Sequence, residues 1–492
     1  MRSKTSPPLP ELPTSFLSPF FPFLIFSFLL FSFFALYSPL AQDFKFSASN
    51  QLEYYLNSGN NKDIFHDWFD FIGKYDIYEA GLRYEAHQPD DFGNTFQEFS
   101  YRYFQVTTKS FQIVAGNYYA MFGRGLILRS YENRDLRFDN NLDGIKGNLN
   151  SGRFDLIVLA GSPRDGYRRI NDPLHGADGK MAISKWLTLG GSFVRTDITN
   201  FGFVRLFGGN ASFVFPHLDL YAEYARKDNP SGESVEKDGE GVYLTSSFYQ
   251  TGFGLTLEYK DYKRLDFTNG GLVYNNPPSL TKEHHYTLLN RNAYILNLYD
   301  EKGIQAQAVA TPQENLSLLA NYSYTTNHQN RLIFSDIYGE IDYDYKSSAT
   351  LKGGFSYMKN RQEVGLPYFL APVFDFTYYV SEKNSIAFSL EHLWTSKYDG
   401  NLTYYDQIIS IGFAHSPNIS LTLTDERTTE WKTRAWSGKK NWLILSLDLA
   451  LGEKHNLTMS VGSRRAGKFC SGGICTDRPA LDGGEIKLLS RF

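Results

Sequence analysis

The chain has 492 residues, of which 16% are aromatic and 21% charged, and its formal net charge is -4. This balance gives no indication of a nucleic acid or another polyanion as partner. Phe and Tyr are abundant, with 40 and 34 residues, whereas Cys and Met occur only 2 and 5 times. Because strands favour aromatic and β-branched residues, the composition favours a β protein.

The first 41 residues are typical of a cleaved signal peptide. Arg2 and Lys4 supply positive charge, and residues 20–36 form a continuous apolar run. The chain becomes polar after Ala41, which predicts cleavage there and a mature protein of residues 42–492. The apolar run also approaches the roughly 20 residues that span a bilayer, so an uncleaved membrane anchor is the alternative.

Apolar and polar residues alternate through the rest of the chain. Residues 253–260 place Phe253, Leu255 and Leu257 on one side, with polar residues between them. Residues 385–394, 419–424 and 442–451 repeat the pattern. A period of two is that of a strand, whereas an amphipathic helix has a period of 3.6. We therefore predict an all-β fold.

Short and long polar breaks separate the predicted strands. Residues 250–252 form a tight break, whereas residues 228–240, 268–285 and 464–484 form long polar stretches. This mixture is typical of an antiparallel up-and-down β-barrel in an outer membrane, with short periplasmic turns and long outer loops. At about 20 residues for each strand with its connections, the chain would form roughly 20–24 strands, an even number.

We predict that lipid, and not a second sheet, covers the apolar side of these strands. In hydrocarbon every backbone N–H and C=O needs an internal partner, so only helices and closed barrels span a membrane. Polar residues that face the lumen explain the mean hydropathy of -0.36. A soluble sandwich or propeller is the alternative. Aromatic residues near the segment ends are expected to form interfacial girdles, namely Tyr259, Tyr262, Tyr322, Tyr324, Trp394 and Trp442.

The chain ends on an aromatic residue, Phe492. Ile486, Leu488, Ser490 and Phe492 share one parity, so in a strand they point to the same face. This ending resembles the C-terminal assembly signal of bacterial outer-membrane proteins, which Ile486, Leu488 and Phe492 fit and Ser490 does not. The resemblance implies the cell outer membrane as location, with outer-membrane lipid and the barrel-assembly machinery as partners.

Residues 116–144 break the alternation and are rich in charge. The charged residues, which surround an FGRG turn, are Arg124, Arg129, Glu132, Arg134, Asp135, Arg137, Asp139 and Asp143. An arginine on the lipid face costs about 2–4 kcal/mol at the bilayer midplane, so we expect this segment to face the lumen or to fold into it. It would form either a constriction that filters charged or sugar-like solutes, or an ion-pair network that rigidifies the wall.

The two cysteines, Cys470 and Cys475, flank a Ser-Gly-Gly sequence in the last long polar stretch. An exported chain meets an oxidising compartment, so we predict a disulfide that closes this loop. The spacing lacks the further ligands of a zinc site. No P-loop and no dinucleotide-binding motif occurs, so we expect neither a metal nor a cofactor.

Three stretches resemble a family of unknown function that consists of large outer-membrane β-barrel proteins from Gram-negative bacteria. They are GNYYAMFGRGLILRSYE (116–132), QEFSYRYFQV (97–106) and SRRAGKFCSGGIC (463–475). The resemblance runs from about residue 44 to the C-terminus. It implies the barrel fold and the location, but no substrate and no catalytic residues.

These observations lead us to expect a porin-like outer-membrane channel or transporter, which passes or binds small hydrophilic solutes through a charged lumen. A non-conducting barrel that serves as a scaffold or surface-binding component is the first alternative. An outer-membrane hydrolase is the second. We do not expect an enzyme, because the ten scattered histidines offer no obvious base for a nucleophile at the rim.

Overall fold

The computed structural model describes residues 44–57, 63–198, 202–229, 238–269, 272–292, 294–430, 439–471 and 474–492. The predicted signal peptide, residues 1–41, lies outside this part of the chain. Within it, no helix combines the length and the apolarity that are needed to cross a membrane.

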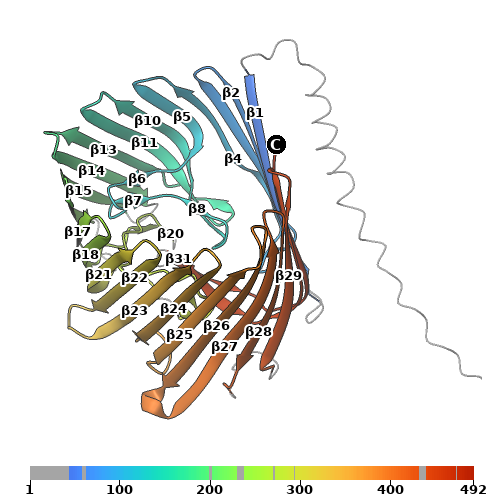
Figure 1. Ribbon diagram of the computed structural model, residues 1–492. Helices are drawn as coiled ribbons and strands as arrows, with labels where there is room; N and C mark the ends of the chain where they lie inside the picture. Colours follow the sequence, from blue (N-terminus) through green and yellow to red (C-terminus); the bar gives the residue numbers. More distant parts are fainter. Residues whose placement is uncertain are drawn as a thin grey trace, which may run out of the picture.

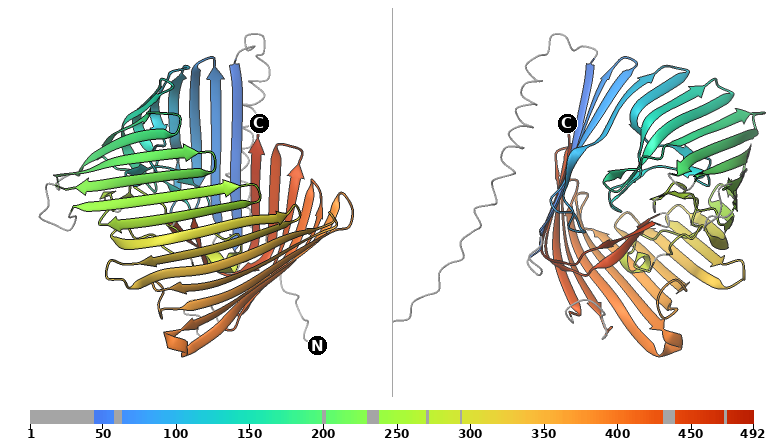
Figure 2. Two further views of the ribbon diagram at one scale, coloured as in Figure 1. Left: turned by 60° about the vertical axis from the view of Figure 1, so that its left-hand side comes forward. Right: turned by 180° about the vertical axis from the view of Figure 1, so that it is seen from behind.

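Twenty-four antiparallel strands form one closed barrel (Figures 1 and 2). They are β1 (Phe44–Asn57), β2 (Ile64–Tyr75), β3 (Tyr78–His87), β4 (Phe96–Thr107), β5 (Phe111–Tyr118), β10 (Leu142–Asn150), β11 (Phe154–Asp165), β13 (Leu174–Ala182), β14 (Leu187–Ile198), β15 (Gly202–Phe215), β16 (Leu218–Asp228), β17 (Gly239–Gln250), β18 (Phe253–Lys263), β21 (Asp300–Gln313), β22 (Leu316–Thr326), β23 (Leu332–Tyr345), β24 (Ala349–Asn360), β25 (Tyr368–Tyr379), β26 (Asn384–Lys397), β27 (Leu402–His415), β28 (Ile419–Thr428), β29 (Asn441–Leu451), β30 (His455–Arg464) and β33 (Leu481–Arg491). The last strand pairs with the first, with Ser49 opposite Arg491, which closes the barrel. The predicted all-β fold and the even strand number are confirmed.

The connections between strands differ in length at the two ends of the barrel. At the end where β1 begins and β33 ends, only tight turns join the strands, such as the one between β15 and β16. We call this the turn end. The longest connections, which follow β5, β18 and β30, all lie at the opposite, loop end. In outer-membrane barrels short turns face the periplasm and long loops face outward, as the sequence analysis expected for this chain.

The outer face of the wall is apolar. Leu257 of β18, Ile304 of β21 and Leu445 of β29 are 47%, 46% and 39% exposed. On the opposite face of β18 and β21, Lys260 and Glu301 are completely buried and form an ion pair at 2.7 Å. Successive residues of a strand point to opposite faces, so this alternation separates a lipid-facing surface from a polar interior.

The C-terminal strand follows the predicted parity. Ile486 and Phe492 are 43% and 45% exposed on the outer face. Glu485, the neighbour of Ile486, is buried on the inner face and pairs with Arg464 at 2.7 Å. The backbone of Phe492 exchanges hydrogen bonds with Ala48 of β1, so the terminal aromatic residue is fixed at the turn end.

Two of the six predicted girdle residues are not on the outer face. Tyr262 is completely buried, and its hydroxyl donates a hydrogen bond to the carbonyl of Pro278. Trp442 is 5% exposed and lies under the guanidinium of Arg465. The prediction was wrong for both because a position near a strand end does not determine the face. Tyr322, Tyr324 and Trp394 are exposed on the outer face, at 39%, 36% and 48%.

Three connections from the loop end fold into the barrel (Figure 1). Inward loop 1 (residues 119–141) contains β6 (Met121–Phe122), β7 (Leu128–Arg129), β8 (Glu132–Asn133) and β9 (Phe138–Asp139). Inward loop 2 (residues 264–269, 272–292 and 294–299) contains β19 (Thr268–Asn269), β20 (Leu272–Val273) and α2 (Thr287–Asn290). Inward loop 3 (residues 465–471 and 474–480) contains β31 (Gly467–Ser471) and β32 (Ile474–Arg478). Two further short elements, β12 (Arg168–Arg169) and the 3₁₀ turn η2 (Tyr398–Gly400), lie in other connections at the loop end.

Inward loops 1 and 2 have an apolar core of their own inside the barrel. Phe122 and Ile127 of inward loop 1 and Phe267 of inward loop 2 are completely buried in one cluster. On the wall, this cluster extends from β5 to β18 and includes Leu206 of β15 and Ala225 of β16. The interior is therefore not polar throughout, because the wall is apolar where these loops cover it.

Candidate functional site: the arginine cluster of the lumen

Inward loop 1 enters the lumen through its FGRG turn. The amide of Gly125 donates a hydrogen bond to the carbonyl of Phe122 at 3.0 Å, which closes the turn. Gly123 and Gly125 have φ angles of 57° and 90°, a region that favours glycine. A Cβ atom on Gly123 would lie 2.3 Å from the carboxylate of Glu223, which accepts the backbone N–H of Arg124 at 2.7 Å. The turn is thereby fixed against β16.

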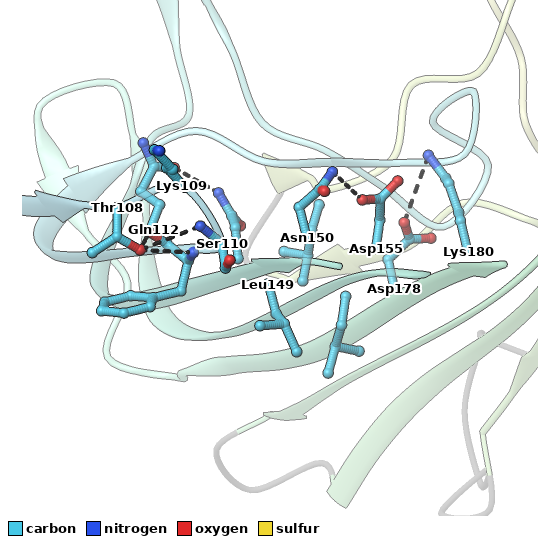
Figure 3. A pocket seen from close by; sticks show the side chains of 13 residues that line it. Thr108, Lys109, Ser110, Gln112, Leu149, Asn150, Asp155, Asp178 and Lys180 are labelled. Carbon is cyan, nitrogen blue, oxygen red and sulfur yellow. Dashed lines mark hydrogen bonds and ion pairs between the residues drawn. The ribbon is translucent and has the colours of Figure 1, made fainter. Parts of the chain in front are cut away.

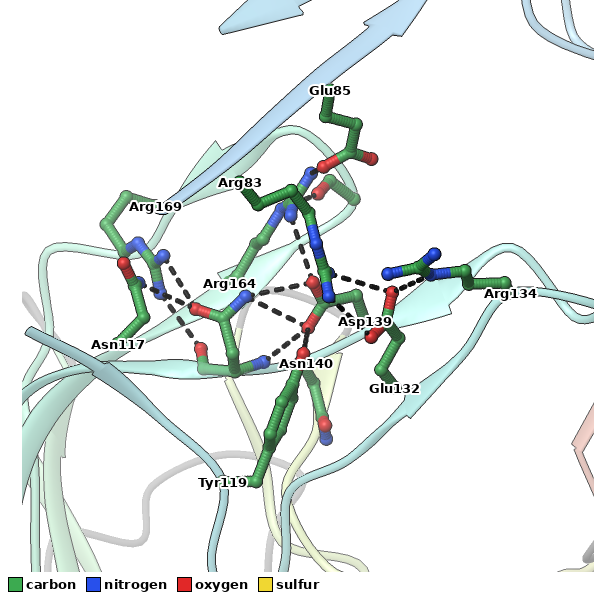
Figure 4. Close-up of polar contacts among 12 residues, drawn as sticks. Arg83, Glu85, Asn117, Tyr119, Glu132, Arg134, Asp139, Asn140, Arg164 and Arg169 are labelled. Atoms are coloured by element: carbon green, nitrogen blue, oxygen red, sulfur yellow. Dashed lines mark hydrogen bonds and ion pairs between the residues drawn. The ribbon is translucent and has the colours of Figure 1, made fainter. Parts of the chain in front are cut away.

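Beyond the turn, four arginines join inward loop 1 to the wall; Figure 4 shows part of this group. We call it the arginine cluster, and it consists of Arg83, Arg134, Arg137 and Arg164 with the carboxylates that they contact. Arg83 of β3 contacts Asp70 of β2 at 2.6 Å and donates two hydrogen bonds to Glu132, at 2.8 and 3.1 Å. Arg134 contacts the same two carboxylates, Asp70 at 2.7 Å and Glu132 at 2.8 Å. Asp70 and Arg83 are direct cross-strand partners, so the wall supplies one half of this group and the loop supplies the other.

A second part of the cluster surrounds Trp68. Arg137 binds Glu53 of β1 at 2.7 Å and Asp91, in the connection after β3, at 3.1 Å. The guanidinium carbons of Arg134 and Arg137 lie 5.6 and 5.3 Å from the centre of the Trp68 ring. Guanidinium groups at this distance are attracted by the face of an indole ring. The ring therefore orients two arginines that come from the same loop.

A third part connects the end of inward loop 1 with β3 and β11. Arg164 of β11 contacts Glu85 at 3.1 Å and Asp139 at 3.0 Å (Figure 4). Asp139 also accepts hydrogen bonds from the Tyr119 hydroxyl at 3.2 Å and from the backbone and side chain of Asn141, both at 2.9 Å. The loop is thus held where it leaves the wall and where it returns to it.

Every guanidinium of the cluster is paired. Arg83, Arg134, Arg137 and Arg164 each contact two carboxylates, which come from the set Glu53, Asp70, Glu85, Asp91, Glu132 and Asp139. Burial raises the pKa of Asp91, but its contacts with His66 and Arg137 outweigh burial and hold that pKa below its usual value. A solute anion would therefore have to compete with a carboxylate already in place.

The arginine cluster lies between two cavities. The loop-side cavity has a volume of about 240 Å³ and is lined by His66, Trp68 and Tyr167 together with the loop-side atoms of the cluster. The turn-side cavity has a volume of about 510 Å³ and is lined by Tyr101, Lys146 and other residues of β1–β5 and β10, together with Tyr119 of inward loop 1. A third cavity of about 470 Å³ lies nearer the turn end, beside β10, β11 and β13 (Figure 3).

The predicted constriction residues do not form one group. Glu132, Arg134, Arg137 and Asp139 lie in the arginine cluster. Arg124 lies over the ring of Tyr221 at 5.2 Å, and Arg129 lies over the ring of Tyr131 at 4.8 Å, both away from the cluster. Asp135 lies in inward loop 1 between β8 and β9, and Asp143 lies on β10. Whether this segment narrows a solute path stays a prediction.

The wall half of the cluster was not predicted from the sequence. Glu53, Asp70, Arg83, Glu85 and Arg164 are spread over four strands and were not selected. The alternation along the strands could have indicated these residues. In three neighbouring strands, charged residues occur at inner-face positions and aromatic residues at outer-face positions. Among the described residues, no group of three or more His, Cys, Asp or Glu side chains is arranged to hold a metal ion.

The cysteine pair lies in inward loop 3. The backbone places Cys470 directly opposite Cys475 in the hairpin of β31 and β32. Their side chains lie outside the described part of the structure, so the disulfide stays a prediction.

Comparisons with known proteins agree with this architecture. The model of the Family of unknown function (DUF6029) matches residues 40–492. No curated protein matches the chain. The chain is similar to the translocation pore of the P pilus usher PapC, with 9% identity and a TM-score of 0.50 over 91% of this chain and 98% of that one. It is also similar to a chain of the E. coli P pilus tip assembly intermediate PapC-PapD-PapK-PapG, with 9% identity and a TM-score of 0.53 over 90% of this chain and 60% of that one. At this identity the likeness shows the fold alone, which is that of an outer-membrane β-barrel.

Proposed function

Because this chain belongs to the Family of unknown function (DUF6029), we propose a function from its own geometry: an outer-membrane channel that passes or binds small hydrophilic solutes. The observation that carries the proposal is the pair of cavities on either side of the arginine cluster, inside a closed barrel. Export through the predicted signal peptide and insertion by the barrel-assembly machinery are part of the same proposal.

The three cavities lie one after another along the inner face of β1–β5, β10, β11 and β13, and polar side chains line each of them. These side chains include His66 near the loop end, Lys146 in the middle, and Asp155 and Lys180 near the turn end. The apolar core of inward loops 1 and 2 covers part of the inner face of β5, β10, β11 and β13 as well as that of β14–β18. A hydrophilic solute would therefore pass from cavity to cavity beside this core, and the arginine cluster would restrict its passage.

Selection at the cluster would depend on size and hydrogen bonding more than on free charge. Each guanidinium already faces two carboxylates, so a passing ion meets a nearly compensated group of charges. Pores that select by charge present rings of one sign, which this cluster does not. We expect small neutral or weakly charged solutes to pass better than strongly charged ones.

Planar-bilayer recording together with liposome swelling tests this proposal. The purified barrel should give discrete conductance steps, and swelling should become slower as the size of a neutral sugar increases. A folded barrel that gives neither steps nor swelling would exclude a channel. Heat-dependent migration in gels, which reports an intact barrel, is the control for folding.

A non-conducting scaffold is the second candidate, because the interior has apolar cores. Besides the cluster around Phe122, a second cluster contains Leu288 and Leu289 of α2 packed against Phe334 and Phe369 of the wall. Such cores are typical of a permanently filled interior. The same recording distinguishes the candidates, since a scaffold would give no steps at any voltage that the bilayer tolerates.

A further inference from the structure

We propose that the turn-side cavity is a binding site for a small acidic sugar, that is, a hydroxylated ring with one carboxylate. Lys146 would contact the carboxylate, and tyrosine side chains would contact the ring. This inference specifies the solute class and rests on the proposed function, but it predicts binding that can be measured without transport.

The charges that line the cavity favour an anionic ligand. Three charged side chains line it, namely Asp70, Arg83 and Lys146. Asp70 and Arg83 pair with each other at 2.6 Å, so they compensate one another. Lys146 forms no ion pair with any carboxylate of the described residues, and its ammonium donates one hydrogen bond, to the carbonyl of Tyr119 at 2.9 Å. The cavity therefore has one uncompensated positive charge.

Lys146 still has donors to offer. A lysine ammonium has three N–H groups, and here one of them contacts the carbonyl of Tyr119. The ammonium nitrogen also lies 5.5 Å from the centre of the Tyr118 ring, which helps to hold the side chain at the cavity wall. A charge that is half-buried without a counterion is costly, so a ligand carboxylate at this place would be stabilising.

The remaining lining suits a hydroxylated ring. Tyr101, Tyr103 and Tyr119 supply amphipathic rings, and Gln105 supplies an amide group. Tyrosine combines an apolar face with a hydrogen-bonding tip, as required for a ring that is apolar on its faces and polar at its edge. The volume of about 510 Å³ lies within the roughly 300–1,000 Å³ of small-molecule sites.

The cavity nearer the turn end provides the matched control. It also contains a lysine, Lys180, but that ammonium lies 3.7 Å from the carboxylate of Asp178 (Figure 3). Its positive charge is therefore compensated. If any lumen lysine sufficed to attract an acidic sugar, the substitution of Lys180 would have the same effect as the substitution of Lys146.

Equilibrium dialysis of the purified full-length barrel in detergent tests the site. The probes are glucuronate, glucose and acetate, so that ring and carboxylate are varied separately. Glucuronate should bind at least ten times more tightly than glucose or acetate. Lys146→Met should remove this preference, whereas Lys180→Met and Lys146→Arg should retain it. Gel migration and urea unfolding show whether each variant is folded.

Three results would overturn the proposal. Equal affinity for glucuronate and glucose would exclude the role of Lys146, and equal affinity for acetate and glucuronate would leave only a simple anion site. Retention of the preference in a folded Lys146→Met variant would place binding elsewhere. A barrel that binds glucuronate but does not conduct would refute the channel and leave the site intact, so the two proposals can fail separately.

Discussion

Replacement of Glu132 by Gln should release inward loop 1 from the wall. The Glu132 carboxylate accepts two hydrogen bonds from Arg83, at 2.8 and 3.1 Å, and one from Arg134 at 2.8 Å. Its side chain is 19% exposed and that of Arg83 is 9% exposed, so water compensates the loss only in part. In the variant, Asp70 would be the only carboxylate shared by the two guanidiniums.

The size of the effect follows from these contacts. A hydrogen bond to a charged group contributes about 1.5–3 kcal/mol, and the Gln amide keeps one acceptor oxygen, so the equivalent of about two such bonds is lost. We expect the free energy of opening of inward loop 1 to decrease by about 3 kcal/mol. Breaking one partner of a buried ion pair costs a similar amount, about 3–5 kcal/mol. At 1.4 kcal/mol for each factor of ten, the loop should open about 100 times more often.

Amide hydrogen exchange with mass-spectrometric detection measures this opening. Peptides that cover residues 119–141 should exchange about 100 times faster in Glu132→Gln, while peptides from β23–β27 should not change. The matched control is Asp197→Asn, which removes a 2.6 Å ion pair with Arg195 whose side chains are 42% and 55% exposed. This control substitution should change the free energy of opening, measured by the same exchange experiment, by less than about 0.5 kcal/mol. Unchanged protection of inward loop 1, or an equal loss of protection in the whole barrel, would refute the reasoning.

Three further predictions concern a pH-dependent contact, the FGRG turn and the lipid face. Burial lowers the pKa of His328, but its hydrogen bonds to Asp300 and Asp261 outweigh burial and raise that pKa. These contacts therefore stabilise the β22–β23 connection below about pH 6.5, and the stabilisation is lost as the pH rises through the raised pKa. After correction for intrinsic rates, amide exchange of residues 327–331 should therefore become faster between pH 6 and pH 9. The variant His328→Gln should not show this acceleration. Gly123→Ala should loosen inward loop 1 by more than about 1–2 kcal/mol in the same exchange assay, because its Cβ would clash with Glu223 in addition to the cost of the positive φ. Leu445→Arg should lower the free energy of unfolding in phospholipid vesicles by about 2–4 kcal/mol, measured by urea titration.

Each of these predictions has a control within the chain. For Gly123→Ala the control is Gly152→Ala, because Gly152 has a φ of 82° but open space where a Cβ would lie. This variant should show the cost of backbone strain alone. Ser446→Arg places the same charge on the inner face beside Leu445, where Ser446 contacts Ser460, and should cost less than the lipid-facing substitution. Equal effects of the two arginine substitutions would contradict the assignment of faces. A pH-independent exchange of residues 327–331 in the unmodified chain would contradict the role of His328.

The sequence by itself determined the class of fold and the direction of most side chains. A period of two is imposed by the geometry of the extended backbone, so Leu257, Leu445 and Ile486 could be placed on one face from local sequence. The cost of arginine in lipid likewise indicated that residues 116–144 belong on the lumen side of the wall. Both features follow from residues that are neighbours in the chain and from the cost of placing a charge in lipid, so the sequence alone predicts them.

Only the tertiary structure decided which charges meet and what fills the barrel. Arg83 and Glu132 are 49 residues apart, and Arg164 and Glu85 are 79 residues apart, so no local pattern connects them. Tyr262 lies on the same face of β18 as Lys260, and inward loop 2 covers its ring. Its position near a strand end does not show this burial. The apolar core around Phe122 could not be predicted from the sequence either, because apolar wall residues look the same in a sequence whether lipid or a folded loop covers them. Closure of the barrel creates the enclosed volume, and the long connections then find partners that are distant in sequence.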